Sequence, residues 1–261
     1  MDRSNIEKIA NNPEDKLLLA KVWDKINSGI RKNIPSNSCF LNQREQEMAS
    51  WLFGAAEGIF HFGGYDEAER KMLIYLPDYL DATFLYGDDS PIACIRATFF
   101  QEDSLSHRDF LGALMGAGIA REAVGDICVG QGSCDFFVTR EIAPYILQNF
   151  TEAGHTKLHL EQISPEDAHI PQPETLEIRD TLASLRLDSV ISAGFRISRS
   201  QAAQYVAAGK AAINGLPCEK PDKSVEESAK ISVRGLGKIK LRTIGGTTRK
   251  GRISVVIDRY I

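Results

Sequence analysis

The sequence predicts an α+β protein with three folded parts and one linker. Apolar residues recur at helical spacing near the N-terminus, β-like and helical runs alternate through the middle, and the charge changes sign near Ile178. The 261 residues are 43% hydrophobic and 25% charged, which is the balance of an ordinary folded protein. This composition excludes a disordered chain, a collagen and a coiled-coil rod.

Residues 1–76 are expected to form a mostly helical N-terminal domain. Apolar side chains from Ile6 to Ile26 follow the helical period, although Pro13 interrupts them. A second helix is expected over residues 42–51, where good helix formers gather. Residues 66–71 are predicted to form a short helical turn, because acids precede bases as the helix dipole favours.

Residues 77–163 are expected to form an α+β middle domain. Helices are predicted at 106–118, with Ser106 as N-cap, and at 141–150. Strands are predicted at 92–100, 126–129, 134–139 and 157–163, with a hairpin turn at 130–133. The resulting order β-α-β-β-α-β is that of ferredoxin-like and RRM-like domains.

Residues 164–178 are expected to be an acidic, proline-rich linker. Pro165, Pro171 and Pro173 lie close together among acidic residues, and such a stretch cannot hold a helix or a central strand. The linker should therefore be extended and exposed, and it should separate the middle domain from a C-terminal domain at 179–261.

The C-terminal domain is expected to begin with two short helices. The first is predicted at 183–192, with Gly194 breaking the chain after it. Ser198 and Gln201 form a capping-box pattern for a second helix that ends near Ala208 before Gly209. The remainder is expected to be β structure, with strands at 211–213, 231–233, 238–241 and 253–257 and turns at 214–215 and 245–246.

Charge separates the C-terminal domain from the rest of the chain. Residues 1–178 carry 15 Lys and Arg against 28 Asp and Glu, whereas residues 179–261 carry 16 against 7. The two parts therefore have net charges of −13 and +9, which together give the −4 of the whole chain. Such a separation indicates a basic module for a polyanion, although solubility alone can also produce uneven charge.

The capped second helix is the leading candidate for binding that polyanion. A helix N-terminus offers unpaired N–H groups to phosphate, and arginines and short polar side chains flank this one. A plain capped surface helix with solvated arginines is the alternative, and the charge of the module favours nucleic acid. The candidate contacts are Arg186, Arg196, Ser198, Arg199, Ser200, Gln201 and Lys210.

These residues belong to a longer pattern that resembles the S4 RNA-binding domain. The pattern spans about 60 residues in the order RLD, SRSQA, GKAAING, KPDK and ISVRGLGK, beginning at Arg186 and ending at Lys238. It departs from the family at Ala211, where valine is usual, and at Ser228-Ala229, where Gly-Asp is usual. The resemblance implies RNA binding by the two-helix face, and it adds Lys220 and Lys223 to the candidate contacts.

The upstream part resembles the YlmH family of S4-domain proteins. The segments that carry this resemblance are FGGYDEAERK at 62–71, HRDFLGALMGAGI at 107–119, Arg121-Glu122 and GDI at 125–127. The resemblance covers nearly the whole chain. It implies a binding role without catalysis on the large ribosomal subunit, with rRNA and tRNA as partners. There the family is implicated in quality control, holding peptidyl-tRNA on stalled large subunits.

Aromatic and basic residues of the middle domain provide weaker indications. Phe99, Phe100, Phe136 and Phe137 lie in the predicted strands, where an RRM stacks bases, but core positions are the favoured interpretation. Ordinary surface charge is likewise favoured over a local RNA patch for the four arginines Arg96, Arg108, Arg121 and Arg140.

Other patterns are given a structural interpretation. Gly112, Gly116 and Gly118 follow no strand, so close helix packing is favoured over a dinucleotide site. His155 and His159 lack a third ligand nearby, and no metal or cofactor is expected.

Three alternatives to a ribosomal binding protein remain. Arg186-Leu187-Asp188 also resembles the RLD of pseudouridine synthases, whose aspartate is catalytic, but too few residues follow to hold their catalytic domain. A tyrosyl-tRNA synthetase is the second alternative, since His61-Phe62-Gly63-Gly64 is faintly similar to the HIGH motif of these enzymes, but nothing like their KMSKS motif follows. A protein-interaction scaffold, for example in cell division, with an RNA-binding tail is the third alternative.

The sequence also predicts where the protein works. The five cysteines are scattered and odd in number, which fits free thiols in a reducing cytoplasm. The N-terminus, Met1 to Asn5, leads into a charged segment without an apolar signal core, and no apolar run is long enough to span a membrane. We expect a cytoplasmic monomer.

Overall fold

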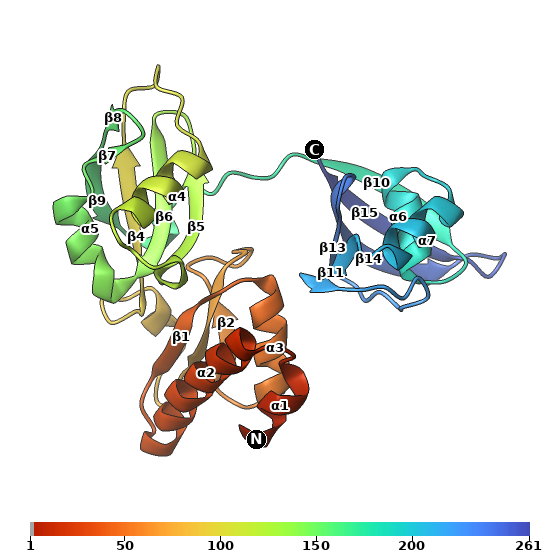
Figure 1. Ribbon diagram of the computed structural model, residues 1–261, viewed down its shortest axis with the longest axis horizontal. Coiled ribbons are helices and arrows are strands. Elements are labelled where there is room, and N and C mark those ends of the chain that lie inside the picture. Colours follow the sequence, from red (N-terminus) through yellow and green to blue (C-terminus); the bar gives the residue numbers. More distant parts are fainter. Residues whose placement is uncertain (1–2) are drawn as a thin grey trace. The chain divides into compact units, whose positions relative to one another are not determined.

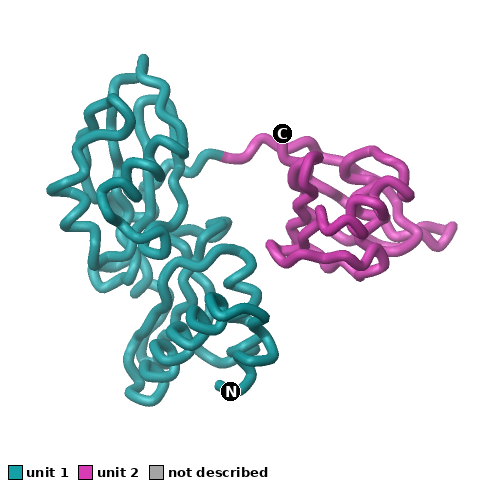
Figure 2. Tube along the Cα trace, in the orientation of Figure 1, with its two compact units in different colours: residues 1–171 teal, residues 172–261 magenta. Residues whose placement is uncertain are grey.

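The computed structural model describes residues 3–261, so Met1 and Asp2 of the charged N-terminus lie outside the described residues. The chain divides into two compact units, one ending at Pro171 and the other running from Gln172 to Ile261 (Figure 2). The division falls inside the predicted linker. No helix among the described residues is long and apolar enough to cross a membrane.

The N-terminal half of unit 1 contains a sheet as well as helices, so the expectation of a helical domain over residues 1–76 was incomplete. Three short strands pair antiparallel in the order β1-β3-β2. Tertiary packing stabilises these strands, since they lack a long alternating pattern of their own. The elements are α1 (Ile6–Ile9), α2 (Pro13–Lys32), β1 (Ser36–Leu41), α3 (Gln43–Phe53), β2 (Ile59–Phe62) and β3 (Lys71–Tyr75) (Figure 1).

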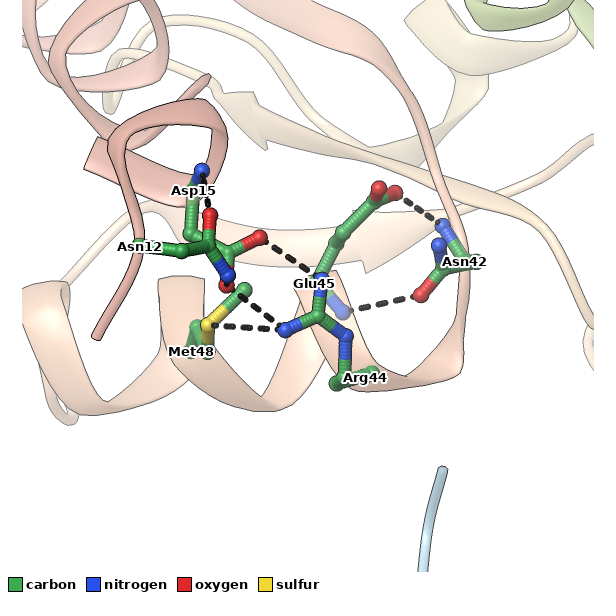
Figure 3. A network of polar contacts seen from close by, with 6 residues as sticks. All are labelled: Asn12, Asp15, Asn42, Arg44, Glu45 and Met48. Carbon is green, nitrogen blue, oxygen red and sulfur yellow. Dashed lines mark hydrogen bonds and ion pairs between the residues drawn. The ribbon is translucent and has the colours of Figure 1, made fainter. Parts of the chain in front are cut away.

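The expected interruption at Pro13 is present, because α1 ends at Ile9 and Pro13 begins α2. It occupies the first position of α2, where a missing N–H costs nothing, and the side chain of Asn12 accepts a hydrogen bond from the N–H of Asp15. Buried Asp15 also holds α3, because its two oxygens accept 2.6 and 2.7 Å hydrogen bonds from Arg44 (Figure 3). This ion pair therefore joins helices α2 and α3 in addition to their apolar contacts.

The second half of unit 1 corresponds to the predicted middle domain and is called the middle half below. It has the predicted element order. Its four-stranded sheet is antiparallel in the order β5-β6-β4-β9. One face packs against α4 and α5 through a core that includes Ile95, Phe110, Phe136 and Ile146. The elements are β4 (Ile92–Thr98), α4 (His107–Gly116), β5 (Val124–Val129), β6 (Ser133–Thr139), α5 (Ala143–Asn149) and β9 (His159–Ile163), with a small hairpin of β7 (Glu152–Ala153) and β8 (Thr156–Lys157).

The other face of that sheet is covered by the N-terminal half. Cys94 and Phe137 on the middle sheet belong to one buried cluster with Phe40 and Met72 of the N-terminal sheet. The ring of Tyr65 lies 5.4 Å from the ring of Phe137, centroid to centroid. The two halves of unit 1 therefore share a hydrophobic core.

A loop between β2 and β3 ties these halves together by hydrogen bonds. The carboxylate of Asp126 on β5 accepts bonds from the Tyr65 hydroxyl at 2.8 Å and from the backbone N–H groups of Glu69 and Arg70 at 2.6 and 3.0 Å. The predicted helical turn at 66–71 was therefore wrong, because a carboxylate distant in sequence takes the backbone donors. Lys71 already belongs to β3.

The linker is shorter than its predicted span of 164–178. Residues 164–170 lie on the middle half, and Pro165–Asp167 form one turn of 3-10 helix. The carboxylate of buried Asp135 accepts hydrogen bonds from Arg96 and from the backbone N–H of His169, which anchors this segment. Thr175 begins a strand of unit 2, and the carbonyl of Glu174 already accepts from the N–H of Ile261 at 3.1 Å, so residues 171–173 join the two units.

Unit 2 is a six-stranded antiparallel sheet with two helices. The strand order is β10-β15-β14-β13-β11-β12. One core packs α6 and α7 against the sheet. The elements are β10 (Thr175–Leu182), α6 (Leu187–Phe195), α7 (Arg199–Ala207), β11 (Ala211–Ile213), β12 (Leu216–Pro217), β13 (Lys230–Val233), β14 (Gly237–Thr247) and β15 (Ile253–Tyr260) (Figure 1).

Three local expectations for unit 2 were wrong. Helix α6 begins at Leu187 and not at Ala183. Gly194 lies inside α6 because the helix approaches the sheet closely there, and an added Cβ would come within 2.7 Å of Ile239. Gly245 and Gly246 sit at an irregularity within β14, and the hairpin turns at 248–251 instead.

Candidate nucleic-acid interface

The second helix of unit 2 begins with the predicted capping box. The Ser198 hydroxyl accepts a 3.2 Å hydrogen bond from the N–H of Gln201, and the Gln201 side chain accepts one from the N–H of Ser198. Ser200 lies beside the cap, with its hydroxyl 3.0 Å from that of Ser198. These three polar side chains are exposed at the positive end of α7, where an anion is favoured.

A buried carboxylate joins the two helices beneath that helix end. Asp188, in the first turn of α6, is 4% exposed. Its oxygens accept hydrogen bonds from Arg186 at 3.1 and 3.3 Å and from Nε of Arg199 at 3.2 Å. Burial acts to raise the pKa of Asp188, but the bonds from these two arginines outweigh it and hold the pKa below its ordinary value. Asp188 is therefore ionised and positions two guanidinium groups at the surface.

The lysine turn, residues 220–223, holds the start of α6. The backbone N–H groups of Leu187 and Asp188 donate to the carbonyls of Lys223 and Pro221 at 2.8 and 3.0 Å. These carbonyls satisfy donors that a helix N-terminus otherwise leaves unpaired. The same contact brings Lys220 and Lys223 to the end of the helix that carries Arg186, and both lysines are exposed.

Arg196 ends α6 in a left-handed conformation with φ of 54°. The turn is closed by the Ser192 hydroxyl, which donates to the Ile197 carbonyl at 2.7 Å, and by the Ile197 N–H, which donates back to the Ser192 carbonyl. Arg196 and Arg199 then line one depression on unit 2. Arg252, which is not among the predicted contacts, lines the same depression.

Lys210 does not join this group. It follows the other end of α7, and its ammonium lies 5.4 Å from the centroid of the Tyr205 ring. The structure thus gathers the predicted contacts into two places. One cluster near the starts of α6 and α7, here called the arginine surface, contains Arg186, Arg196, Ser198, Arg199, Ser200, Gln201, Lys220 and Lys223. Lys210 lies apart.

Arg252, which was not predicted as a contact, belongs to a recognisable basic run in the sequence. The run Thr248-Arg249-Lys250-Gly251-Arg252 is strongly basic and lies between two strands. The turn was expected three residues earlier, at Gly245-Gly246, so the basic residues were not placed at a hairpin tip. Pairing of β14 with β15 reveals their position.

The middle half offers no comparable basic cluster among its described residues. Phe136 and Phe137 are buried, Phe99 is half-buried against the core, and Phe100 is 82% exposed in a loop. The core interpretation is therefore correct for three of these rings and wrong for Phe100. Arg96, Arg121 and Arg140 bind Asp135 or backbone carbonyls within unit 1, and burial lowers the pKa of Arg121 to about 10.

The remaining candidate sites do not form. An ideal Cβ at Gly112 or Gly116 meets nothing within 4 Å, so close helix packing, the favoured interpretation of these glycines, was wrong. Among residues 3–261, no three His, Cys, Asp or Glu side chains are grouped to hold a metal ion. Burial raises the pKa values of the Cys94, Cys128 and Cys134 thiols, so these residues are poor nucleophiles and ligands.

Comparisons with known proteins agree with this division of the chain. Residues 98–167 match the family described as "Putative RNA-binding domain in YlmH", and residues 185–231 match the S4 domain. A relative from Bacillus subtilis (strain 168), ribosome-associated protein quality control protein P2, is 35% identical over 223 residues. The match covers 84% of this chain and 85% of the relative.

A solved structure was also found. Cell division protein ylmH from Streptococcus pneumoniae aligns with a TM-score of 0.49 and 18% sequence identity. The alignment covers 61% of this chain and 98% of that chain.

Proposed function

Because the chain belongs to the YlmH family of S4-domain proteins, we propose that it is an RNA-binding protein that acts on the ribosome. The observation that carries this proposal is the arginine surface of unit 2. There one buried carboxylate orients Arg186 and Arg199 beside a capped helix end, with Lys220 and Lys223 close to the same helix start. Fixed guanidinium groups and exposed ammonium groups are what a phosphate backbone requires.

The partner that we propose is structured RNA of the large ribosomal subunit together with tRNA. The name of the Bacillus subtilis relative, ribosome-associated protein quality control protein P2, supports a role in quality control on the ribosome. The target that we propose there is a stalled peptidyl-tRNA complex. The protein would work as a cytoplasmic monomer. The net charge of +9 over residues 179–261 supports long-range attraction to such a particle.

We propose that this function involves no catalysis. Asp188, the residue that would act in a pseudouridine synthase, is buried and engaged by two arginines and by the Ser189 hydroxyl at 3.2 Å. These contacts support a positioning role for its carboxylate. The protein would therefore stabilise a complex and not turn over a substrate.

The RRM-like character of the middle half is also a proposal. Its element order and the sheet order β5-β6-β4-β9 support it. However, an RRM stacks bases on an open sheet face, and here the N-terminal half covers that face through Phe40 and Met72. We therefore assign the main RNA contacts to unit 2.

Co-sedimentation with small subunits, large subunits and whole ribosomes over a salt series tests the proposal. We expect binding to large subunits that falls by orders of magnitude between low and moderate salt, as neutralisation of about five phosphates requires. Arg199→Glu should weaken it at least tenfold, because it replaces a phosphate contact by repulsion, roughly 1.4 kcal/mol or more.

Arg179→Glu is the matched control for this charge reversal. Arg179 is exposed on β10 and pairs with Glu177, outside the arginine surface. We expect this variant to bind nearly as wild type. Equal loss in both variants would mean that net charge alone drives binding, and unchanged binding by Arg199→Glu would refute the arginine surface. Binding by residues 1–171 alone would indicate the scaffold alternative.

A further inference from the structure

Three arginines from separate parts of unit 2 line one depression of about 320 Å³. Arg196 comes from the end of α6, Arg199 from the start of α7 and Arg252 from the end of the β14–β15 hairpin. Arg196 and Arg252 are 56 residues apart in the sequence, so the fold, and not a local repeat, brings the three arginines together. Such a gathering of like charges costs energy unless an anion compensates it.

Hydrogen bonds hold the guanidinium groups of Arg199 and Arg252, and a closed turn fixes the backbone of Arg196. Arg199 donates through Nε to buried Asp188, which leaves the other end of its guanidinium for a ligand. Arg196 projects from a left-handed residue whose turn is closed by the paired Ser192–Ile197 bonds. Residues of α6 therefore fix the guanidinium of Arg199, through Asp188, and the backbone of Arg196.

Arg252 is braced on the first strand of the unit. Its Nε donates to the carbonyl and the hydroxyl of Thr181 at 3.1 and 3.0 Å, and its Nη2 also donates to that carbonyl. The backbone of Arg252 is fixed as well. Its carbonyl accepts from the N–H of Thr248 at 2.7 Å, and its N–H donates to the Thr248 hydroxyl at 3.1 Å. The hairpin thus presents Arg252 in a defined direction.

The chemistry of the lining selects a phosphate group. Among the described residues that line the depression, Asp180 is the one carboxylate against three guanidinium groups. That carboxylate already accepts a 2.6 Å bond from the N–H of Thr181. Guanidinium groups bind phosphate oxygens by paired, charge-assisted hydrogen bonds. The hydroxyls of Ser189 and Ser192 also line the depression, but they already donate to Asp188 and to the Ile197 carbonyl, so the arginines carry the recognition.

We propose that the β14–β15 hairpin completes a pocket for one RNA backbone phosphate with Arg196, Arg199 and Arg252. Arg252 lies outside residues 185–231, the segment that matches the S4 domain, so this subsite is an addition to that domain. The hairpin extends beyond the two helices and carries the further basic residues Arg249 and Lys250 at its tip (Figure 1). This inference rests on the proposed function, because it extends the same surface.

The test is equilibrium binding of the full chain to purified large ribosomal subunits at several salt concentrations. Arg252→Ala should weaken binding about tenfold and lower the slope of log affinity against log salt by about one, as loss of one phosphate contact requires. Arg252→Lys should keep the slope but lose affinity, because an ammonium cannot make the paired contact. Arg179→Ala, on the same strand as Thr181 but outside the depression, should change neither quantity.

A double-mutant cycle tests whether the arginines share one phosphate. We expect Arg196→Ala and Arg252→Ala together to weaken binding by less than the product of their separate effects, since either change already damages the same pocket. Strictly multiplicative effects would mean separate contacts and would overturn the shared pocket. Thermal unfolding of each variant should stay close to wild type, because both side chains are exposed.

The outcomes separate this inference from the proposed function. If Arg199→Glu loses binding while Arg252→Ala binds as wild type with the same salt slope, the RNA-binding proposal stands and the hairpin subsite is refuted. If neither variant changes binding, both are refuted. If inorganic phosphate stabilises the wild type but not Arg252→Ala, and RNA binding is unaffected by that change, the pocket takes a free anion and the RNA assignment is overturned.

Discussion

Asp188 orients two arginines of the proposed RNA-binding surface from a buried position. Its carboxylate lies at the start of α6 and accepts from both Arg186, the N-cap residue of α6, and Arg199, the first residue of α7. Arginine side chains lose much rotational freedom when they bind a phosphate. A buried anchor removes part of that freedom before the RNA arrives, so the two guanidinium groups are already oriented.

Asp188→Asn should therefore cost both stability and affinity. Loss of a buried charged partner leaves two arginines uncompensated, and we expect the free energy of unfolding of unit 2 to fall by about 1–3 kcal/mol. RNA affinity should fall several-fold, even though the substitution removes a negative charge that would repel RNA. Urea unfolding followed by circular dichroism and equilibrium RNA binding measure the two effects.

The pKa of Asp188 determines how the stability difference between wild type and Asp188→Asn changes with pH. The pKa of Asp188 is lower in the folded state than its ordinary 3.8, so its ionisation stabilises the folded protein above that value. The advantage of wild type over Asp188→Asn should be constant near neutral pH and should shrink as the pH falls below about 3.8. An advantage that grows in acid would show that the carboxylate is not the stabilising partner of the arginines.

At the scale of elements, local sequence predicted three capped helix starts, whereas the strands of the N-terminal half were missed. The caps at Asn42, Ser106 and Ser198 depend on residues within one turn, and each was either predicted as a cap or placed at a predicted helix start. The strands of the N-terminal half were missed because their stability comes from partners far away in sequence. Ser36–Leu41, for example, pairs with Lys71–Tyr75.

The same distinction holds within the candidate site. The capping box and the basic residues near it could be read from the sequence, since they are close along the chain. The placement of Lys223 at the start of α6 and of Arg252 beside Arg196 depends on backbone contacts between distant segments. Net charge indicated the unit that carries the arginine surface, but only the pairing of the strands showed which cations lie together.

The β2–β3 loop provides a prediction at this scale. Gly64 has φ of +100°, and an added Cβ would lie 2.3 Å from a ring carbon of Phe137. We expect Gly64→Ala to lower the free energy of unfolding by about 3 kcal/mol, because backbone strain adds to the displacement of a buried ring. Urea unfolding of the full chain measures this loss.

Gly112→Ala is the control for the glycine substitution. Gly112 lies within α4 with nothing within 4 Å of an added Cβ, so this change should stabilise the protein by about 0.5–1 kcal/mol. Opposite signs for the two glycines would support the packing described here. A neutral Gly64→Ala would contradict the close approach of the loop to Phe137.

At the scale of the molecule, the shared core of unit 1 determines which pieces can fold alone. The middle half packs one sheet face on its own helices and the other on the N-terminal half. Unit 2, in contrast, has one core of its own. A piece cut inside unit 1 therefore exposes a buried face, whereas a piece cut between the units does not.

We expect residues 172–261 to fold cooperatively and to retain salt-dependent RNA binding when produced alone. Residues 77–163 alone should aggregate or bind a hydrophobic dye, because Cys94, Cys128 and Phe137 lose their cover. Residues 1–171 should not show that exposure. A soluble 77–163 fragment with a sharp unfolding transition would contradict the shared core. Circular dichroism, dye fluorescence and RNA binding of the three fragments provide the comparison.

The three residues between the units, Pro171-Gln172-Pro173, also limit how the two units can act together. An extended proline-rich segment spans about 3.1 Å per residue, so this tether reaches about 9 Å. Once either unit is bound to a large particle, the other samples a small volume, and its local concentration there reaches about the millimolar range. A weak second contact within that reach would then lengthen the residence time of the whole protein, whereas a stronger contact beyond it would add nothing.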